Sequence, residues 1–224
     1  MEVASIVRYE DAIQAVKKYG LLPLSSYISD HPSLESLTPK ENWHSDTDAD
    51  PWRWRVRLAD DKEAAYGKFF KKKPTFISLE LFPYMRSLRG DQRSIQERYE
   101  AGLVSRAAYL IYQAIEEKGI TDARTLRGLV GMKAKEEKTP FENALVDLQE
   151  SFDIVITGSK PRNNQEGQNS GWNSMSFDIT DRWFAGFDDV KKWYPREQAI
   201  ERVFQHLERK CSPTALTQFR KILT

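Results

Sequence analysis

The chain has 224 residues, enough to bury a hydrophobic core and to form one or two domains. Its 34 Lys and Arg residues nearly cancel its 33 Asp and Glu residues, so no overall field favours a nucleic acid, a membrane surface or an acidic ligand. A single cysteine excludes an internal disulfide, and neither a secretory leader nor an apolar stretch of about 18 residues is found. We therefore expect a globular cytoplasmic protein with no membrane segment, in which any electrostatic attraction is local.

Residues 1–95 predict an N-terminal α+β lobe. Apolar residues at helical spacing before Gly20 indicate its first helix, and the prolines that follow indicate an irregular segment. In chain order we expect a helix over residues 9–19, a short strand at 21–24, a helix over 51–65, a strand or turn at 75–78 and a helix over 78–86.

The helix expected from residue 51 has a competing interpretation. Asp50 followed by Pro51 is typical of a helix start, with the aspartate as the cap and the proline in the first turn. Against this, Trp52, Trp54 and Val56 alternate with three arginines, as the residues of a strand do. The capping pattern favours the helix.

Residues 101–180 give the sharpest pattern and predict a winged-helix domain. Ser105, Thr121 and Thr139 each precede an apolar segment of helical period, the last in a capping box with Glu142. The expected elements are a helix over residues 105–118, a shorter one after residue 121, a third from residue 139 with Phe141, Leu145, Leu148 and Phe152 on its core face, and two strands at 154–157 and 175–179. Three helices followed by a hairpin form a helix-turn-helix with a β-hairpin wing.

Residues 181–224 predict a C-terminal helical extension packed on the other lobes. Pro195 opens a helix to about residue 210, and Ser212 before Pro213 starts a last short helix. The expected fold class is therefore α+β, mainly helical, with winged-helix architecture.

Several short stretches resemble the AlkZ-like winged-helix proteins, especially the shorter proteins called AlkZ-related. The stretches are Pro32-Ser33-Leu34-Glu35-Ser36-Leu37, Trp43-His44, Asp50-Pro51-Trp52-Arg53-Trp54-Arg55, Ala65-Tyr66-Gly67-Lys68-Phe69-Phe70, Phe76-Ile77-Ser78 and Pro195-Arg196-Glu197-Gln198-Ala199. They span most of the chain. The AlkZ-like family includes DNA glycosylases that excise alkylated or cross-linked bases. The resemblance implies tandem winged-helix-like lobes and a cytoplasmic, DNA-associated role.

The chain departs from that family at the catalytic motif. The glycosylases of the AlkZ-like family carry a three-residue motif on an early strand: Gln or His, then an apolar residue, then Gln or Asp. The comparable strand here is Leu21-Leu22-Pro23-Leu24, which has no side chain able to accept a proton or bind a water. The catalytic residues are therefore unknown, and whether the chain is an enzyme stays open. Asp48, Asp50 or Glu63 could act beside a sugar, but an exposed acidic loop is the simpler explanation.

Two basic regions and one predicted helix are candidates for binding double-stranded DNA. Basic residues interleaved with aromatics grip a nucleic-acid backbone, and a basic hairpin tip contacts phosphates without reading sequence. Asn143 is a plausible base reader on a third helix that otherwise presents carboxylates. The candidate residues are Arg53, Arg55, Lys68, Lys71, Lys72, Lys73, Lys133, Lys135, Lys138, Asn143, Lys160 and Arg162. A packing role for the aromatics and solvated turns for the lysines are the alternative explanations.

No recognised metal or cofactor pattern is present. His31, His44 and His206 are scattered, and Cys211 has no partner at zinc spacing. Phosphate-loop, dinucleotide and Gly-x-Ser-x-Gly motifs do not occur. Three functions stay open: a DNA-binding or damage-recognition protein without a catalytic motif, a DNA glycosylase that excises alkylated bases with an unusual catalytic group, and a winged-helix module for protein contacts.

Overall fold

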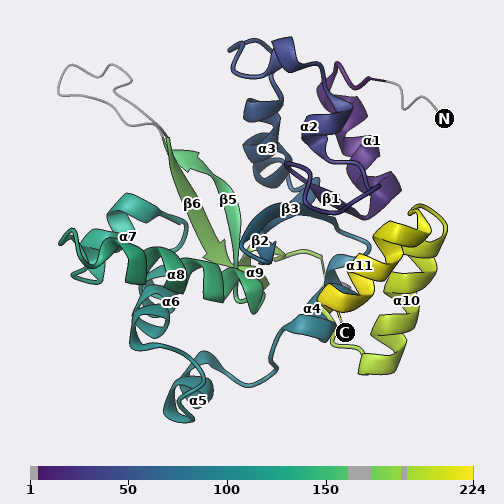
Figure 1. Cartoon of the computed structure of the whole chain (residues 1–224). Helices are drawn as coiled ribbons and strands as arrows, with labels where there is room; N and C mark the ends of the chain where they lie inside the picture. Colours follow the sequence, from purple (N-terminus) through teal and green to yellow (C-terminus); the bar gives the residue numbers. More distant parts are fainter. Residues whose placement is uncertain (1–4, 161–172, 188–190, 224) are drawn as a thin grey trace.

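The structure is a computed structural model that describes residues 5–160, 173–187 and 191–223. One six-stranded antiparallel sheet runs through both halves of the chain. In Figure 1, α1 to α3 form one group of helices, α6 to α8 a second, and α4, α10 and α11 a third. The fold is α+β, as the sequence predicts.

The two halves of the chain repeat one order of elements: helix, strand, two helices, two strands. The first half contains α1 (Tyr9–Tyr19), β1 (Leu21–Pro23), α2 (Leu34–Leu37), α3 (Pro51–Asp60), β2 (Ala64–Phe70) and β3 (Lys73–Ser78), with a 3-10 turn at Lys40–Asn42. Helices α4 (Phe82–Arg89) and α5 (Ile95–Glu100) connect the halves. The second half contains α6 (Arg106–Lys118), β4 (Thr121–Asp122), α7 (Ala123–Leu129), α8 (Lys138–Glu150), β5 (Ile154–Lys160) and β6 (Ser174–Ile179). The remaining helices are α9 (Thr180–Trp183), α10 (Arg196–Glu208) and α11 (Pro213–Leu223).

The strand order β1-β3-β2-β5-β6-β4 joins the two halves edge to edge. In each half the first strand pairs with the third, and the third pairs with the second. The halves meet where β2 runs antiparallel to β5, with Tyr66 opposite Ile156. Because both second strands lie at this joint, the strand order is symmetric about it.

Alternate residues of the central strands enter two different cores. Tyr66 and Ile156 face the core covered by α1, α3, α6 and α8, whereas Ala65 and Val155 face the core covered by α4, α10 and α11. Burial on both faces explains why the sequence of β2 shows no alternation between apolar and polar residues. This strand could not be recognised from its period.

Most predicted elements are confirmed, and the differences lie at their ends. Helix α3 ends at Asp60, and the expected continuation to residue 65 is wrong because the chain enters β2 at Ala64. The capping box at Thr139 is also wrong, since α8 begins one residue earlier, at Lys138, and has no side-chain cap. The sequence does not predict the short helices α2, α5 and α9 or the strand β2.

The cap of α7 differs from the sequence prediction as well. Asp122 accepts hydrogen bonds from the N–H groups of Arg124 and Thr125, whereas the Thr121 hydroxyl donates to the Gly119 carbonyl. An aspartate satisfies two free N–H groups at a helix start with one carboxylate, which makes it the stronger cap here.

The turn between β2 and β3 has an unfavourable backbone conformation for its residues. Lys71 and Lys72 occupy the two-residue loop with φ of 49° and 59°, the left-handed region that glycine and asparagine prefer. The second half of the chain compensates, because Glu150 on α8 accepts a hydrogen bond from the Lys72 N–H at 2.9 Å. The turn is therefore held from outside its own hairpin.

Relief of this strain gives a first test. We expect Lys72→Gly to raise the free energy of unfolding by about 1 kcal/mol, because a residue with a Cβ atom is disfavoured by about that amount in left-handed backbone. Urea denaturation measures the change. Lys73→Gly is the matched control: Lys73 begins β3, and glycine within a strand costs roughly 0.5–1 kcal/mol. Equal effects of the two substitutions would contradict the assignment of strain to residue 72.

His31 lies buried between α1 and α11 as a neutral side chain. Its Nε2 lies 2.8 Å from the carbonyl oxygen of Leu21, which can only accept, so Nε2 carries the proton. The rings of Tyr19 and Phe219 pack edge-on at 5.8 and 5.0 Å. Burial lowers the pKa of His31 below its ordinary value of 6.5, and the bond to Leu21 opposes this.

The depressed pKa of His31 predicts loss of stability in acid. As the pH falls below 6.5, the unfolded chain takes up the proton before the folded protein does, so the free energy of unfolding decreases until the folded-state pKa is passed. We expect His31→Gln to lose less stability than wild type between about pH 7.5 and about pH 5.5. Urea denaturation at both values measures this, and an equal loss in the two proteins would contradict the prediction.

Candidate functional site

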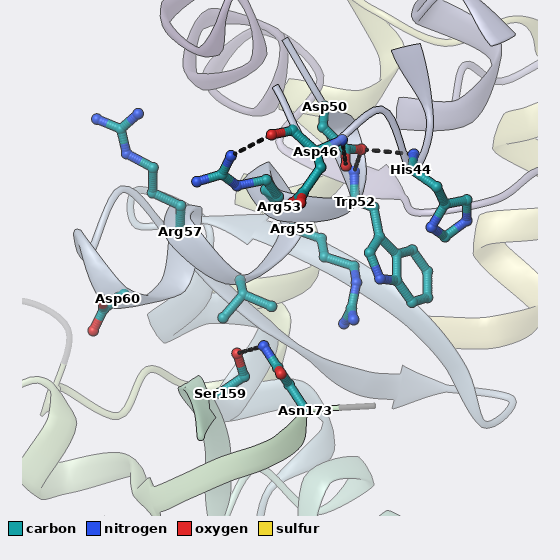
Figure 2. Close-up of a pocket in the computed structure, with 11 residues that line it drawn as sticks. His44, Asp46, Asp50, Trp52, Arg53, Arg55, Arg57, Asp60, Ser159 and Asn173 are labelled. Carbon is teal, nitrogen blue, oxygen red and sulfur yellow. Dashed lines mark hydrogen bonds between the residues drawn. The ribbon is translucent and has the colours of Figure 1, made fainter. Parts of the chain in front are cut away.

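A cavity of about 750 Å³ lies between α3 and the β5–β6 hairpin, with walls from both halves of the chain (Figure 2). The loop before α3 contributes His44, Asp46 and Asp50, and the hairpin contributes Ser159 and Asn173. Helix α3 supplies the rest of the lining, including three arginines and one tryptophan. The size falls within the range of small-molecule sites.

Asp50 fixes the loop and the start of α3 to each other. Its Oδ1 accepts hydrogen bonds from the N–H groups of Trp52 at 2.9 Å and His44 at 3.0 Å, and its Oδ2 accepts from the Asp46 N–H at 3.3 Å. The residue is 3% exposed. A carboxylate held by three backbone donors acts as a structural cap. Asp50, a candidate catalytic acid in the sequence analysis, therefore has its carboxylate engaged in this cap.

Helix α3 presents three different faces. Trp54 and Leu58 enter the core, and the Trp54 indole donates to the Asp48 carbonyl at 2.7 Å. Arg53 and Arg57, four residues apart, extend to one side of the helix, while Arg55 extends to the other side beside the pocket tryptophan (Figure 2).

Arg55 is buried as a cation without a carboxylate partner. It is 8% exposed and makes no ion pair within the described ranges of the chain, and its Nε has no hydrogen-bond acceptor. The guanidinium lies over the Trp52 ring at 3.7 Å, and Nη1 donates to the Met175 sulfur at 3.6 Å. Its positive charge and a side-chain hydrogen bond with Tyr66 oppose the rise that burial causes in the pKa of Tyr66. None of these partners carries the full negative charge of an anion.

The other two arginines are more exposed and differ in their partners. Arg53 donates to the backbone carbonyls of Asp46 and Thr47 at 3.0 and 3.4 Å. Arg57 pairs with Asp61 at 3.1 Å and lies over the Tyr9 ring at 3.9 Å. The charge of Arg57 is therefore partly neutralised, whereas Arg53 meets only neutral acceptors in the hydrogen bonds found.

Aromatic rings line the pocket beside Arg55. The His44 and Trp52 rings lie 4.8 Å apart at their centroids, and Trp43 lies 6.4 Å from Trp52. The sequence assigned Trp52 to packing, but only Trp54 of the pair is fully buried. The helical period could have indicated this position of Trp52, because residues three apart, such as Trp52 and Arg55, lie on the same side of a helix.

The basic loop at residues 68–73 lies against α8 in the second half. The Lys68 N–H donates to the Gln149 side chain at 3.0 Å, and the Lys72 ammonium donates to the Asn143 Oδ1 at 3.4 Å. Lys71 and Lys73 are exposed. The structure thus brings together two sets of predicted DNA-binding residues, the basic loop and Asn143, and the amide of Asn143 is engaged by Lys72.

The remaining predicted residues lie elsewhere on the second half. Lys133, Lys135 and Lys138 are exposed in and beside the loop before α8, and Lys138 lies 3.8 Å from Glu142. Lys160 ends β5 next to the pocket residue Ser159 and lies 3.9 Å from Asp122. Arg162 lies outside the described residues.

Within residues 5–160, 173–187 and 191–223, no group of three His, Cys, Asp or Glu side chains lies close enough together to hold a metal ion. Over the same ranges no helix is both long and apolar enough to cross a bilayer.

Replacing Arg55 tests whether its buried charge lowers the stability of the folded protein. We expect Arg55→Met to leave the free energy of unfolding unchanged or to raise it by up to about 2 kcal/mol, because an apolar side chain of similar length removes an uncompensated buried charge. Urea denaturation measures this. A loss of more than about 2 kcal/mol would mean that Arg55 is structurally satisfied in a way its contacts do not indicate.

Comparison with known proteins gives one match. No curated protein and no solved structure is similar enough to match the chain. A family model described as "AlkZ related" matches residues 6–224. The match covers both halves, the pocket and the C-terminal helices, and the chain therefore belongs to the AlkZ-related family.

Proposed function

We propose that the protein binds duplex DNA as a damage-recognition protein without a catalytic motif, through tandem winged-helix lobes at residues 1–95 and 101–180. The observation that carries the proposal is the repeated order of elements with first-to-third strand pairing, in which the third helix of the first lobe presents three arginines to an open cleft. Residues 181–224 form the extension that packs on these lobes. Membership of a family named for a DNA glycosylase gives the link to DNA repair.

Helix α3 suits DNA better than α8 does. In a helix-turn-helix the last helix of the motif meets the major groove and the phosphates beside it. The exposed side of α8 carries Glu142 and Asp147, which repel phosphates, and its Asn143 is engaged by Lys72. Arg53 on α3 is exposed and meets no carboxylate in its hydrogen bonds, so it is the better phosphate ligand.

The β5–β6 hairpin offers a second basic residue. Lys160 follows the cleft residue Ser159 on β5 but is not part of the cleft lining, since successive side chains of a strand point to opposite faces. It is exposed, and its ammonium lies 3.9 Å from the buried Asp122. A lysine on a hairpin contacts phosphates without sequence preference. Arg53 in the cleft and Lys160 on the hairpin would thus each neutralise one phosphate.

A glycosylase activity has less support from the geometry. Strand β1 is buried along its whole length and carries only Leu21, Leu22 and Pro23. The Asp50 carboxylate is used as a cap, and Glu63 pairs with Lys17 at 3.0 Å. Recognition of DNA without base excision is therefore the function that the described residues favour.

Salt-dependent binding tests the proposal. We expect the wild-type protein to bind a labelled duplex in fluorescence anisotropy, with affinity that falls between about 50 mM and about 200 mM salt. Arg53→Ala with Lys160→Ala should weaken binding and reduce the slope of log affinity against log salt by about 2, one for each lost phosphate contact. Lys71→Ala with Lys73→Ala tests whether the β2–β3 turn adds to the contact.

The matched control removes two exposed positive charges from the C-terminal extension. Lys210→Ala with Lys221→Ala should leave both affinity and slope unchanged. No binding of wild type at low salt would refute the proposal and favour a module for protein contacts. Release of a base from an alkylated duplex would replace it with the glycosylase alternative.

A further inference from the structure

We propose that the cleft beside α3 receives a single unpaired nucleotide of a DNA strand, with its phosphate at Arg55 and its base against the His44 and Trp52 rings. The inference rests on the proposed binding of DNA and names the kind of DNA that the site prefers. It assigns a ligand to residues that a fully paired duplex would leave unused.

The buried cation indicates an anionic ligand group. Arg55 is 8% exposed, its Nε lacks an acceptor, and neither the Trp52 ring nor the Met175 sulfur carries a full negative charge. A guanidinium offers several N–H donors in a planar fork that matches phosphate oxygens. A phosphate that entered the cleft would therefore satisfy a group that the folded chain leaves under-satisfied.

The rings beside Arg55 indicate that the ligand is also planar and aromatic. His44 and Trp52 lie 4.8 Å apart and tilted by 51°, so they form an angled wall rather than a closed stack. A nucleobase stacks on such side chains whatever its sequence. The cavity of about 750 Å³ has room for one nucleotide.

The opposite wall carries polar groups suited to the edge of a base. Asn173 donates to the Ser159 hydroxyl at 3.4 Å, a long bond that leaves both groups able to take other partners (Figure 2). Asparagine and serine side chains bond to the donor and acceptor atoms along base edges. Phosphate, base face and base edge thus each meet a matching part of the cleft.

The position of the cleft explains why the nucleotide must be unpaired. A base inside a duplex is stacked on both faces and cannot place a face against a protein ring, so it has to leave the stack. Arg53, an exposed residue of the cleft lining, can hold a phosphate of the flanking strand while it does so. The energy needed is smallest for a base that already lacks a partner.

Anisotropy titrations with two labelled duplexes of equal length test the inference. One duplex is fully paired and the other carries a single-nucleotide bulge with 2-aminopurine as the extra base. We expect wild type to bind the bulged duplex about 5- to 150-fold more tightly, the range that stacking of one base gives, with quenching of the 2-aminopurine emission. We also expect Arg55→Met to lose most of this preference, measured as the ratio of its affinities for the bulged and the paired duplex.

A second variant guards against an indirect effect of Arg55 on folding. His44 has a φ of 60°, which asparagine tolerates, so His44→Asn removes a ring without disturbing the loop. It should lower the preference and the quenching while leaving binding of the paired duplex unchanged. Lys210→Ala with Lys221→Ala should retain both.

The outcomes separate the two proposals. Equal binding of the paired and bulged duplexes by wild type would overturn this inference and leave the proposed DNA binding intact. A preference that survives in both pocket variants would also overturn it, because the preference would arise elsewhere. Failure to bind either duplex would refute the proposed function itself and this inference with it.

Discussion

The structure depends on the antiparallel contact between β2 and β5. Each half of the chain has a three-stranded sheet of its own, and pairing of Tyr66 with Ile156 joins the two into one sheet. Residues on both sides of this joint are buried, so neither core is complete without strands from the other half. The cleft beside α3 is a result of the same contact, because the joint sets the distance between a helix of the first half and a hairpin of the second.

A second contact between the halves decides which helix is available to a ligand. The turn at Lys71 and Lys72 rests on α8, where Glu150 and Asn143 receive its N–H and ammonium groups. This leaves the corresponding helix of the first half, α3, with its arginines beside open space. The two halves therefore share an order of elements, but their corresponding helices α3 and α8 differ in the chemistry of their surfaces.

The sequence predicts the elements of the fold better than their assembly. Capping by Ser105 and Asp50 and the apolar period of α6 and α8 are local signals, and they place those helices correctly. Strand β2 gives no such signal, since it is buried on both faces and its partner lies on a distant β5. The joint between the halves could not be inferred for that reason.

The candidate site was predictable in part. Arg53 and Arg55 were recognised as basic residues near tryptophans, but a list of charges cannot tell that one is exposed and the other is buried under a ring. That distinction follows from the rotation of α3 on its core residue Trp54. Ser159 and Asn173 carry no distinguishing pattern in the sequence, and only the sheet brings them opposite α3.

The joint at Tyr66 and Ile156 has a consequence for how the chain folds. Within each half the hairpin strands are neighbours in sequence or separated by one loop, whereas the joint connects residues from opposite halves of the chain. Closing so long a loop costs more conformational entropy than closing a hairpin, and contacts between distant residues slow folding. We therefore expect pairing of β2 with β5, which joins the two cores, to be the slow step in folding.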